Sequence, residues 1–331
     1  MFINREYSLP YFRTKKWSDR YLVVSSYVEN GRSQKFFQEF PTARYVSVEY
    51  SVNMTADSVI NDEFSVKTNY VSKLHNTHYK SLYQDLHEFV EQLHCETMYI
   101  VIDISNMHLR FLGAFLAVMA EYDWSSVICT YTETTGYPRL KEIDPVDRKQ
   151  INRIGAFDLN SSFWGYNEIP NLATVDSERD NHVWIAFLGF EGKRSAAVYN
   201  EISDDAKTTI PVITMPSVRP GWANSAFEAN QILFENATIS SADIRYVDAL
   251  NPFATYNFIE KIQGEYPDRH LIISPLATRP VSLGVLLYAL LNEKSEVYFD
   301  TPKDPYGRTL SNGNIHIYDI LSFFEKMKAR R

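Results

Sequence analysis

VVSSYVENGRS at 23–33 and AFLGFEGKRS at 186–195 are two similar stretches in this chain of 331 residues. Each is an apolar run followed by an aromatic residue, a Glu, a Gly, a basic residue and a Ser. Arg194 follows Arg32 by 162 positions. The first half of the pattern predicts a strand, and the Gly and Ser predict a turn into a helix.

A second pair of similar stretches follows in the same order. These are IVIDISNMHLRFLGAFLAVM at 100–119 and LIISPLATRPVSLGVLLYAL at 271–290. Gly284 follows Gly113 by 171 positions, close to the offset of the first pair. Motifs that recur in the same order at a nearly constant offset indicate a tandem duplication.

Short, continuously apolar strands alternate with helical segments in both halves, which is typical of a parallel sheet with helices on both faces. The sequence therefore predicts an α/β protein with two tandem, internally duplicated, Rossmann-like three-layer domains and mostly parallel sheets. We expect a first lobe at 1–145, a linker with an aromatic loop at 146–180, and a second lobe at 181–331.

Composition limits the classes of protein that the chain can belong to. Its length suffices for two domains, and its 45% hydrophobic and 22% charged residues are ordinary for a globular protein. A net charge of −8 argues against an extended nucleic-acid-binding surface, because such surfaces neutralise phosphates with basic residues. The apolar stretch at 281–291 is too short to span a membrane. We therefore expect no membrane association.

No metal or cofactor is predicted. Cys95 and Cys129 have no metal-ligand spacing, and the glycine motifs of dinucleotide and P-loop sites are absent. The sequence also has no zinc-protease motif and no nucleophile elbow. Without a signal peptide at its start, a cytoplasmic location is expected.

The repeated motifs place polar residues where strands run into helices. In open parallel sheets ligands bind at the carboxyl ends of the strands, and helix N-termini favour phosphate or carboxylate groups. Arginine adds a fork of donors suited to an anion. The candidate ligand-binding residues are Ser26, Gly31, Arg32, Ser33, Arg110, Tyr137, Gly189, Gly192, Lys193, Arg194, Ser195, Thr278, Arg279 and Tyr306.

Three carboxylates are candidates for chemistry. Glu29 and Glu191 occupy matching positions in the first pair of motifs, where each could bind a ribose hydroxyl, act as a general base or attack a sugar carbon. Asp103 ends a strand of the second pair, and its counterpart lies near Ser274. This difference predicts one active half or an asymmetric ligand.

A structural interpretation of the same residues stays open. A Ser before a helix is commonly an N-cap, and an Arg in a first turn is commonly solvated. Duplication preserves scaffold features as well as site features, so recurrence alone does not separate the two.

A strand that leads through a Gly/Ser/Thr-rich loop into a helix with a basic first turn resembles the general plan of CRISPR-associated Rossmann-fold sensors. The resemblance implies paired Rossmann-like domains that bind cyclic oligonucleotides across their pairing axis. A tandem duplication would be the one-chain form of such a pair. The Thr-Gly-Gly-Thr-Lys loop of that family is absent here, where SPLATRP at 274–280 and DISNMHLR at 103–110 stand instead.

Three functions follow as hypotheses. The first is binding of a nucleotide or other phosphorylated small molecule between two pseudo-symmetric lobes, as a ligand sensor. The second is a hydrolase or transferase that acts on a glycosidic or phosphoryl bond, with a Glu as nucleophile or base. The third is an adaptor subunit with a protein partner, supported by the 14% aromatic content. The sequence leaves open whether there is catalysis.

Overall fold

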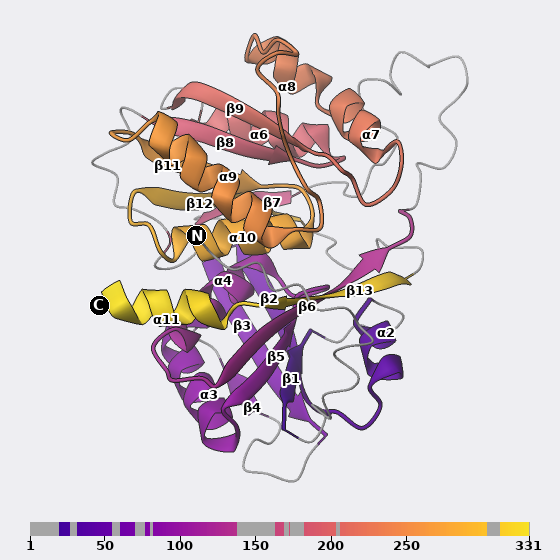
Figure 1. Ribbon diagram of the computed structural model, residues 1–331, viewed down its shortest axis with the longest axis vertical. Coiled ribbons are helices and arrows are strands. Elements are labelled where there is room, and N and C mark those ends of the chain that lie inside the picture. Colours follow the sequence, from indigo (N-terminus) through magenta and orange to yellow (C-terminus); the bar gives the residue numbers. More distant parts are fainter. Residues whose placement is uncertain are drawn as a thin grey trace. The chain divides into compact units, whose positions relative to one another are not determined.

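The computed structural model divides the chain into two compact units, each built on one β-sheet (Figure 1). Unit 1 comprises residues 1–136 together with 309–331, and unit 2 comprises residues 137–308. The structure describes residues 20–26, 32–54, 60–69, 77–79, 82–137, 163–168, 172, 182–202, 206–302 and 312–330.

Unit 1 contains a seven-stranded sheet in the order β13-β6-β5-β1-β2-β3-β4. Strands β6, β5, β1 and β2 are parallel, whereas β3, β4 and β13 run antiparallel to their neighbours. The elements in chain order are β1 (Leu22–Ser25), α2 (Arg32–Glu39), β2 (Arg44–Met54), β3 (Ile60–Thr68), β4 (Thr77–Tyr79), α3 (Leu82–Glu96), β5 (Tyr99–Asp103), α4 (Leu109–Met119), β6 (Ser126–Thr134), β13 (Asn312–Asp319) and α11 (Leu321–Arg330).

Unit 2 contains a six-stranded sheet in the order β10-β9-β8-β11-β12-β7, in which only β7 is antiparallel among the strands that the structure describes. The elements in chain order are β7 (Phe163–Glu168), β8 (His182–Leu188), α6 (Gly192–Ile202), β9 (Ala206–Thr214), α7 (Trp222–Ala229), α8 (Gln231–Asn236), β10 (Arg245–Val247), α9 (Pro252–Glu265), β11 (His270–Pro275), α10 (Arg279–Ala289) and β12 (Ser295–Pro302).

The apolar runs of the repeated motifs form the centres of both sheets. In unit 1 Val23 of β1 and Val101 of β5 are fully buried in a cluster with Phe36 and Phe40 of α2. In unit 2 every residue of β8 is buried. Helix α10 packs closely on α9 because Gly284 has no side chain, and a Cβ there would lie 2.2 Å from the carbonyl oxygen of Pro252. The predicted α/β class is therefore confirmed, with sheets that are mixed as well as parallel.

The two sheets share a strand order. Strands β6-β5-β1-β2 of unit 1 and β12-β11-β8-β9 of unit 2 are parallel, and each set has the same order in the sheet relative to its order in the chain. Each set of four is extended by an antiparallel strand beside its last member, β13 on β6 and β7 on β12. Strand β7 follows β6 of unit 1 in the chain but belongs to the sheet of unit 2. Strand β13 follows β12 of unit 2 in the chain but belongs to the sheet of unit 1.

This exchange places two segments differently from the sequence analysis. Residues 163–168 form strand β7 within the predicted linker at 146–180. Residues 312–330, which we assigned to the second lobe, form β13 and α11 of unit 1. The physical reason is strand pairing between segments far apart in the chain, which local patterns do not reveal. Among the described residues no helix is long and apolar enough to cross a membrane.

Candidate functional site

The carboxyl ends of β1, β5 and β6 bring a buried carboxylate and several hydroxyls together in unit 1. Asp103, the last residue of β5, is 1% exposed. Its Oδ2 accepts a hydrogen bond from Ser25 Oγ at 3.0 Å, and its Oδ1 accepts from Ser105 N at 3.1 Å and from Ser105 Oγ at 2.6 Å. Burial raises the pKa of the Asp103 carboxyl, and these donors together with Arg32 act in the opposite direction. Asp103 therefore organises the loop after β5.

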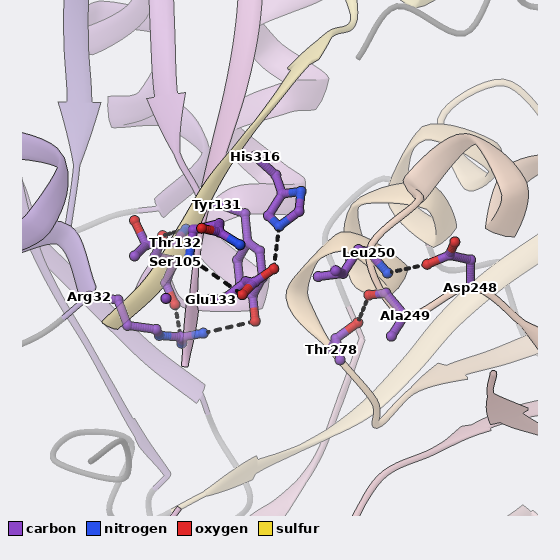
Figure 2. Close-up of polar contacts among 12 residues, drawn as sticks. Arg32, Ser105, Tyr131, Thr132, Glu133, Asp248, Ala249, Leu250, Thr278 and His316 are labelled. Atoms are coloured by element: carbon purple, nitrogen blue, oxygen red, sulfur yellow. Dashed lines mark hydrogen bonds and ion pairs between the residues drawn. The ribbon is translucent and has the colours of Figure 1, made fainter. Parts of the chain in front are cut away.

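Arg32 is the first residue of α2 and lies beside this loop, half-buried (Figure 2). Its Nη2 donates to the carbonyl oxygen of Ser105, and its Nη1 donates to Tyr131 Oη at 3.4 Å. The guanidinium carbon lies 5.4 Å from the centre of the Tyr131 ring, a cation–π contact. Its Nε is buried and has no hydrogen-bond partner among the described residues.

Two further buried hydroxyls lie on β6. Thr130 and Thr132 are each 1% exposed, and neither Oγ1 has a hydrogen-bond partner in the described part of the chain. Thr130 is the register partner of Asp103, and the backbone N–H of Thr132 donates to Ser105 Oγ at 2.8 Å. Buried polar groups are normally paired, so these hydroxyls call for a polar partner beyond the described residues.

Glu133 and His316 form a hydrogen-bonded carboxylate–imidazole pair at the same end of β6 (Figure 2). His316 Nε2 lies 2.6 Å from Glu133 Oε1, and the backbone N–H of Asn314 donates to Glu133 Oε2 at 3.4 Å. The sequence analysis missed both residues. Glu133 lies within a segment that has an ordinary strand pattern and no recognised motif. His316 comes into contact with Glu133 only because β13 pairs with β6.

The hydroxyls of Ser26 and Ser33 form hydrogen bonds to the protein backbone and do not line an open surface. Ser26 Oγ donates to the carbonyl oxygen of Val48 at 2.8 Å. Ser33 Oγ donates to the carbonyl oxygen of Ser26 at 3.4 Å and accepts from Asn106 Nδ2 at 2.9 Å. These bonds tie the start of α2 to the ends of the neighbouring strands, so both serines position Arg32.

Arg110, another candidate, has a protein partner. Its Nε donates to Asp62 Oδ2 at 2.8 Å, and both side chains are largely buried. His108, two residues earlier, accepts the Arg110 backbone N–H at its Nδ1 and caps α4. Arg110 therefore joins α4 to β3.

The matching residues of unit 2 bind one another. Arg194 forms an ion pair with Glu191 three residues earlier, and Ser195 Oγ donates to Asn230 Oδ1. Asn230 is fully buried and donates to the carbonyl oxygens of Gly189 at 2.8 Å and Ala226 at 2.7 Å. Lys193 is exposed. Glu191 and Arg194 of this motif are thus paired with each other inside unit 2.

The two glycines of this motif lie against backbone. A Cβ on Gly189 would lie 2.4 Å from the carbonyl oxygen of Leu276, and a Cβ on Gly192 would lie 1.6 Å from that of Ala229. Close packing of α6 therefore accounts for Gly192.

The structure also shows where the other candidate residues of unit 2 lie. Thr278 precedes α10 and donates through Oγ1 to the carbonyl oxygen of Ala249 at 2.5 Å (Figure 2), and Arg279 begins the helix, half-buried. Ser274, the counterpart of Asp103, accepts from Trp184 Nε1 at 3.0 Å. In unit 2, a buried tryptophan therefore donates to a serine hydroxyl at the position where unit 1 has the carboxylate of Asp103.

Tyr137 belongs to a group of three aromatic rings in unit 2. Its ring centre lies 5.6 Å from that of Phe190 and 5.3 Å from that of Trp222. All three side chains are half-buried, so Tyr137 packs mainly on its own unit. Glu29, Gly31 and Tyr306 lie outside the described residues.

The structure thus gathers Arg32, Asp103, Ser26 and Ser33 at one edge of unit 1 and pairs Arg194 and Glu191 with each other in unit 2. Within the described ranges, no group of three or more His, Cys, Asp or Glu residues could hold a metal ion. The chain matches no known family model, and none of the curated proteins matches its sequence. The candidate site therefore has to be judged from its own geometry.

Proposed function

We propose that the chain binds a nucleotide or another phosphorylated small molecule at the carboxyl ends of β1, β5 and β6 in unit 1, and that it serves as a ligand sensor. Arg32 is the main anion-binding residue in this proposal. The observation that carries it is the buried Nε of Arg32, which has no hydrogen-bond partner among the described residues and lies beside the loop that follows β5.

The chemistry of these groups fits a phosphate. The guanidinium stands at the first position of α2, where free backbone N–H groups and the helix dipole also favour an anion. Thr130 and Thr132 each supply a hydroxyl that can donate to a phosphate oxygen. Tyr131 lies against one face of the guanidinium, Nη1 and Nη2 donate to Tyr131 and Ser105, and Nε remains as a donor for a phosphate oxygen.

The duplication that we infer from the repeated motifs is supported by the shared order of four parallel strands. Under this proposal the two copies have diverged, and Arg194 of unit 2 is occupied by its ion pair with Glu191. We therefore expect one phosphate site per chain, in unit 1. The free thiols of Cys95 and Cys129 are compatible with the cytoplasmic location proposed here.

The test is a thermal-shift and calorimetry screen with AMP, ADP, ATP, cyclic di-AMP, glucose 6-phosphate and inorganic phosphate. A ligand at a hundredfold excess over its dissociation constant stabilises the folded state by about 2.7 kcal/mol, which raises the melting temperature measurably. Arg32→Ala should weaken binding roughly 10- to 100-fold, because a hydrogen bond to a charged group contributes about 1.5–3 kcal/mol.

Two further variants make the screen specific. Arg194→Ala is the matched control and should leave affinity unchanged. Arg32→Lys keeps the charge without the fork of donors, so it should bind more weakly than wild type and more tightly than Arg32→Ala. Unchanged affinity in a folded Arg32→Ala protein, or an absence of binding across the panel, would overturn the proposal.

A further inference from the structure

We propose that Asp103 is a positioning residue of the anion site, which acts through Ser105 to fix the guanidinium of Arg32 in the orientation that binds the ligand. The inference rests on the function proposed above and adds to it the residues that set the geometry of the site. It gives Asp103 a role one residue away from the ligand, in place of the direct chemistry that its position at a strand end suggested.

Ser105 links the carboxylate to the guanidinium. Its N–H and its hydroxyl both donate to Oδ1 of Asp103, at 3.1 and 2.6 Å. Its hydroxyl also accepts the backbone N–H of Thr132 at 2.8 Å, and its carbonyl oxygen accepts Nη2 of Arg32 (Figure 2). Hydrogen bonds to β5 and β6 thus fix Ser105, and with it the direction of the carbonyl oxygen that meets the arginine.

The surroundings of Asp103 favour an indirect role. Asp103 is 1% exposed and Ser105 is 0% exposed. Ser25 Oγ donates to Oδ2 of Asp103 at 3.0 Å, so both carboxylate oxygens already accept hydrogen bonds from the protein. Arg32 is half-buried, and its Nε has no partner among the described residues. A ligand would therefore meet the arginine, while the carboxylate acts behind it.

The fold itself does not require a carboxylate at this position. Unit 2 has Ser274 in strand β11, 171 positions after Asp103 and at the matching place in its sheet. In both units the strand runs through a loop into a helix, α4 in unit 1 and α10 in unit 2. Because burial of a carboxylate costs free energy, its presence in unit 1 alone points to a function in that unit.

An arginine that is fixed before the ligand arrives binds more tightly than a flexible one. The arginine side chain has many rotamers, and a flexible side chain loses this freedom on binding. Nη2 of Arg32 is held by Ser105, and Nη1 is held by Tyr131, whose ring also lies against the guanidinium. A variant that frees Ser105 should therefore weaken binding through Arg32.

A double-mutant cycle on the full chain tests this dependence. Calorimetry measures binding of the six compounds of the panel above, and each compound that binds the wild type is carried through the cycle. Asp103→Asn should weaken binding roughly 3- to 100-fold, the range of couplings within one hydrogen-bond network. In the Arg32→Ala background the same substitution should change affinity less than about twofold, because the residue through which it acts is gone.

Ser105→Ala is a second variant that leaves the carboxylate in place. It removes the hydroxyl between Asp103 and Thr132 and keeps the carbonyl oxygen that accepts Arg32, so it should lower affinity in the same Arg32-dependent way. Nitrogen-15 NMR of the Arg32 Nε–Hε group, assigned by its loss in Arg32→Lys, reports the positioning itself. Its signal should be sharp in wild type and broad in both variants. This signal decides the question where Arg32→Ala binds too weakly for calorimetry.

Asp248→Asn is the matched control in unit 2. Asp248 Oδ1 accepts the N–H of Leu250 two residues later at 2.8 Å (Figure 2), the same local turn that Asp103 makes with Ser105. Its substitution should change neither affinity nor the Arg32 signal.

Two results would overturn the inference and leave the binding proposal standing. One is wild-type affinity with a sharp Arg32 signal in folded Asp103→Asn and Ser105→Ala proteins. The other is a loss of affinity that persists in full in the Arg32→Ala background, since Asp103 would then act on the ligand by another route. Failure of every compound to bind the wild type overturns both proposals.

Discussion

Arg110 Nε donates a hydrogen bond to Asp62 Oδ2 at 2.8 Å, and this buried ion pair joins helix α4 to strand β3. Tyr50 of β2 donates to the other carboxylate oxygen at 2.5 Å. Burial and the neighbouring Asp62 charge both raise the pKa of the Tyr50 phenol, so its hydroxyl remains a donor. The network fixes three elements of unit 1 and accounts for an arginine that the sequence suggested as a ligand-binding residue.

Removal of Arg110 should therefore destabilise the fold. Arg110→Ala leaves the carboxylate of Asp62 buried without its cation, and we expect a loss of about 3–5 kcal/mol in the free energy of unfolding. The double variant Arg110→Ala/Asp62→Ala should lose less than the sum of the two single variants, because it leaves no unpaired charge. Urea unfolding of the four proteins measures this coupling. Simple additivity would show that the pair contributes nothing.

Gly192 gives a second prediction on stability. Gly192→Ala would place a Cβ 1.6 Å from the carbonyl oxygen of Ala229, so α6 or the end of α7 has to move. We expect the free energy of unfolding to fall by about 1–3 kcal/mol or more, as for other forced contacts in a packed interior. Gly264→Ala is the control. Apart from its chain neighbours and its own helix backbone, no atom lies within 4 Å of a Cβ at this exposed helical position, and alanine should stabilise α9 by about 0.5–1 kcal/mol. Equal effects in urea unfolding would contradict this account.

The sequence could predict the parallel strands and the helices that follow them. Apolar runs such as those at 22–24 and 100–102 form central strands, and the following polar turns start helices, because both signals are local. It also placed Arg32 and Asp103 at one end of their strands, where the structure brings them together. Glu191 immediately precedes α6 and Arg194 lies in its first turn, so their spacing of three residues allowed this local ion pair to be expected.

Contacts between distant segments could not be predicted. Strand β13 pairs with β6, and Glu133 meets His316 across 183 positions of sequence. No local pattern specifies which strand an edge strand will join. The packing of Gly192 on Ala229 and the binding of Ser195 by Asn230 depend in the same way on how α6, α7 and α8 meet. The roles of individual residues at the strand ends therefore required the structure.

Asn230 offers a test of the motif in unit 2. Its Nδ2 donates to two carbonyl oxygens, so the position needs an amide. An ionised carboxylate has no proton to donate to these two acceptors. Asn230→Ala should lower the free energy of unfolding, since each unpaired buried group costs about 1–3 kcal/mol. Asn230→Asp should cost more than alanine at neutral pH, and the difference should shrink on acidification. Urea unfolding at two pH values checks the order, and a stable Asn230→Asp protein would contradict it.

Asp103 gives a prediction about how the stability of the folded state depends on pH. Burial raises the pKa of its carboxyl in the folded protein above the ordinary value of 3.8. The folded state then binds the proton more tightly than the unfolded state. The stabilisation from protonation is fully present below 3.8 and is lost as pH rises through the folded-state pKa. Relative to Asp103→Asn, wild type should therefore gain stability as pH falls.

Asp123 supplies the control with the opposite sign. A hydrogen bond from Lys328 and the charge of that ammonium group lower the pKa of the Asp123 carboxyl. Its contribution to stability is present above 3.8 and is lost as pH falls through the lowered value. Wild type should thus lose stability relative to Asp123→Asn on acidification. Urea unfolding of the three proteins between about pH 3 and 8 compares the two slopes. Slopes of the same sign would show that Asp103 is not a carboxyl held at a raised pKa by burial.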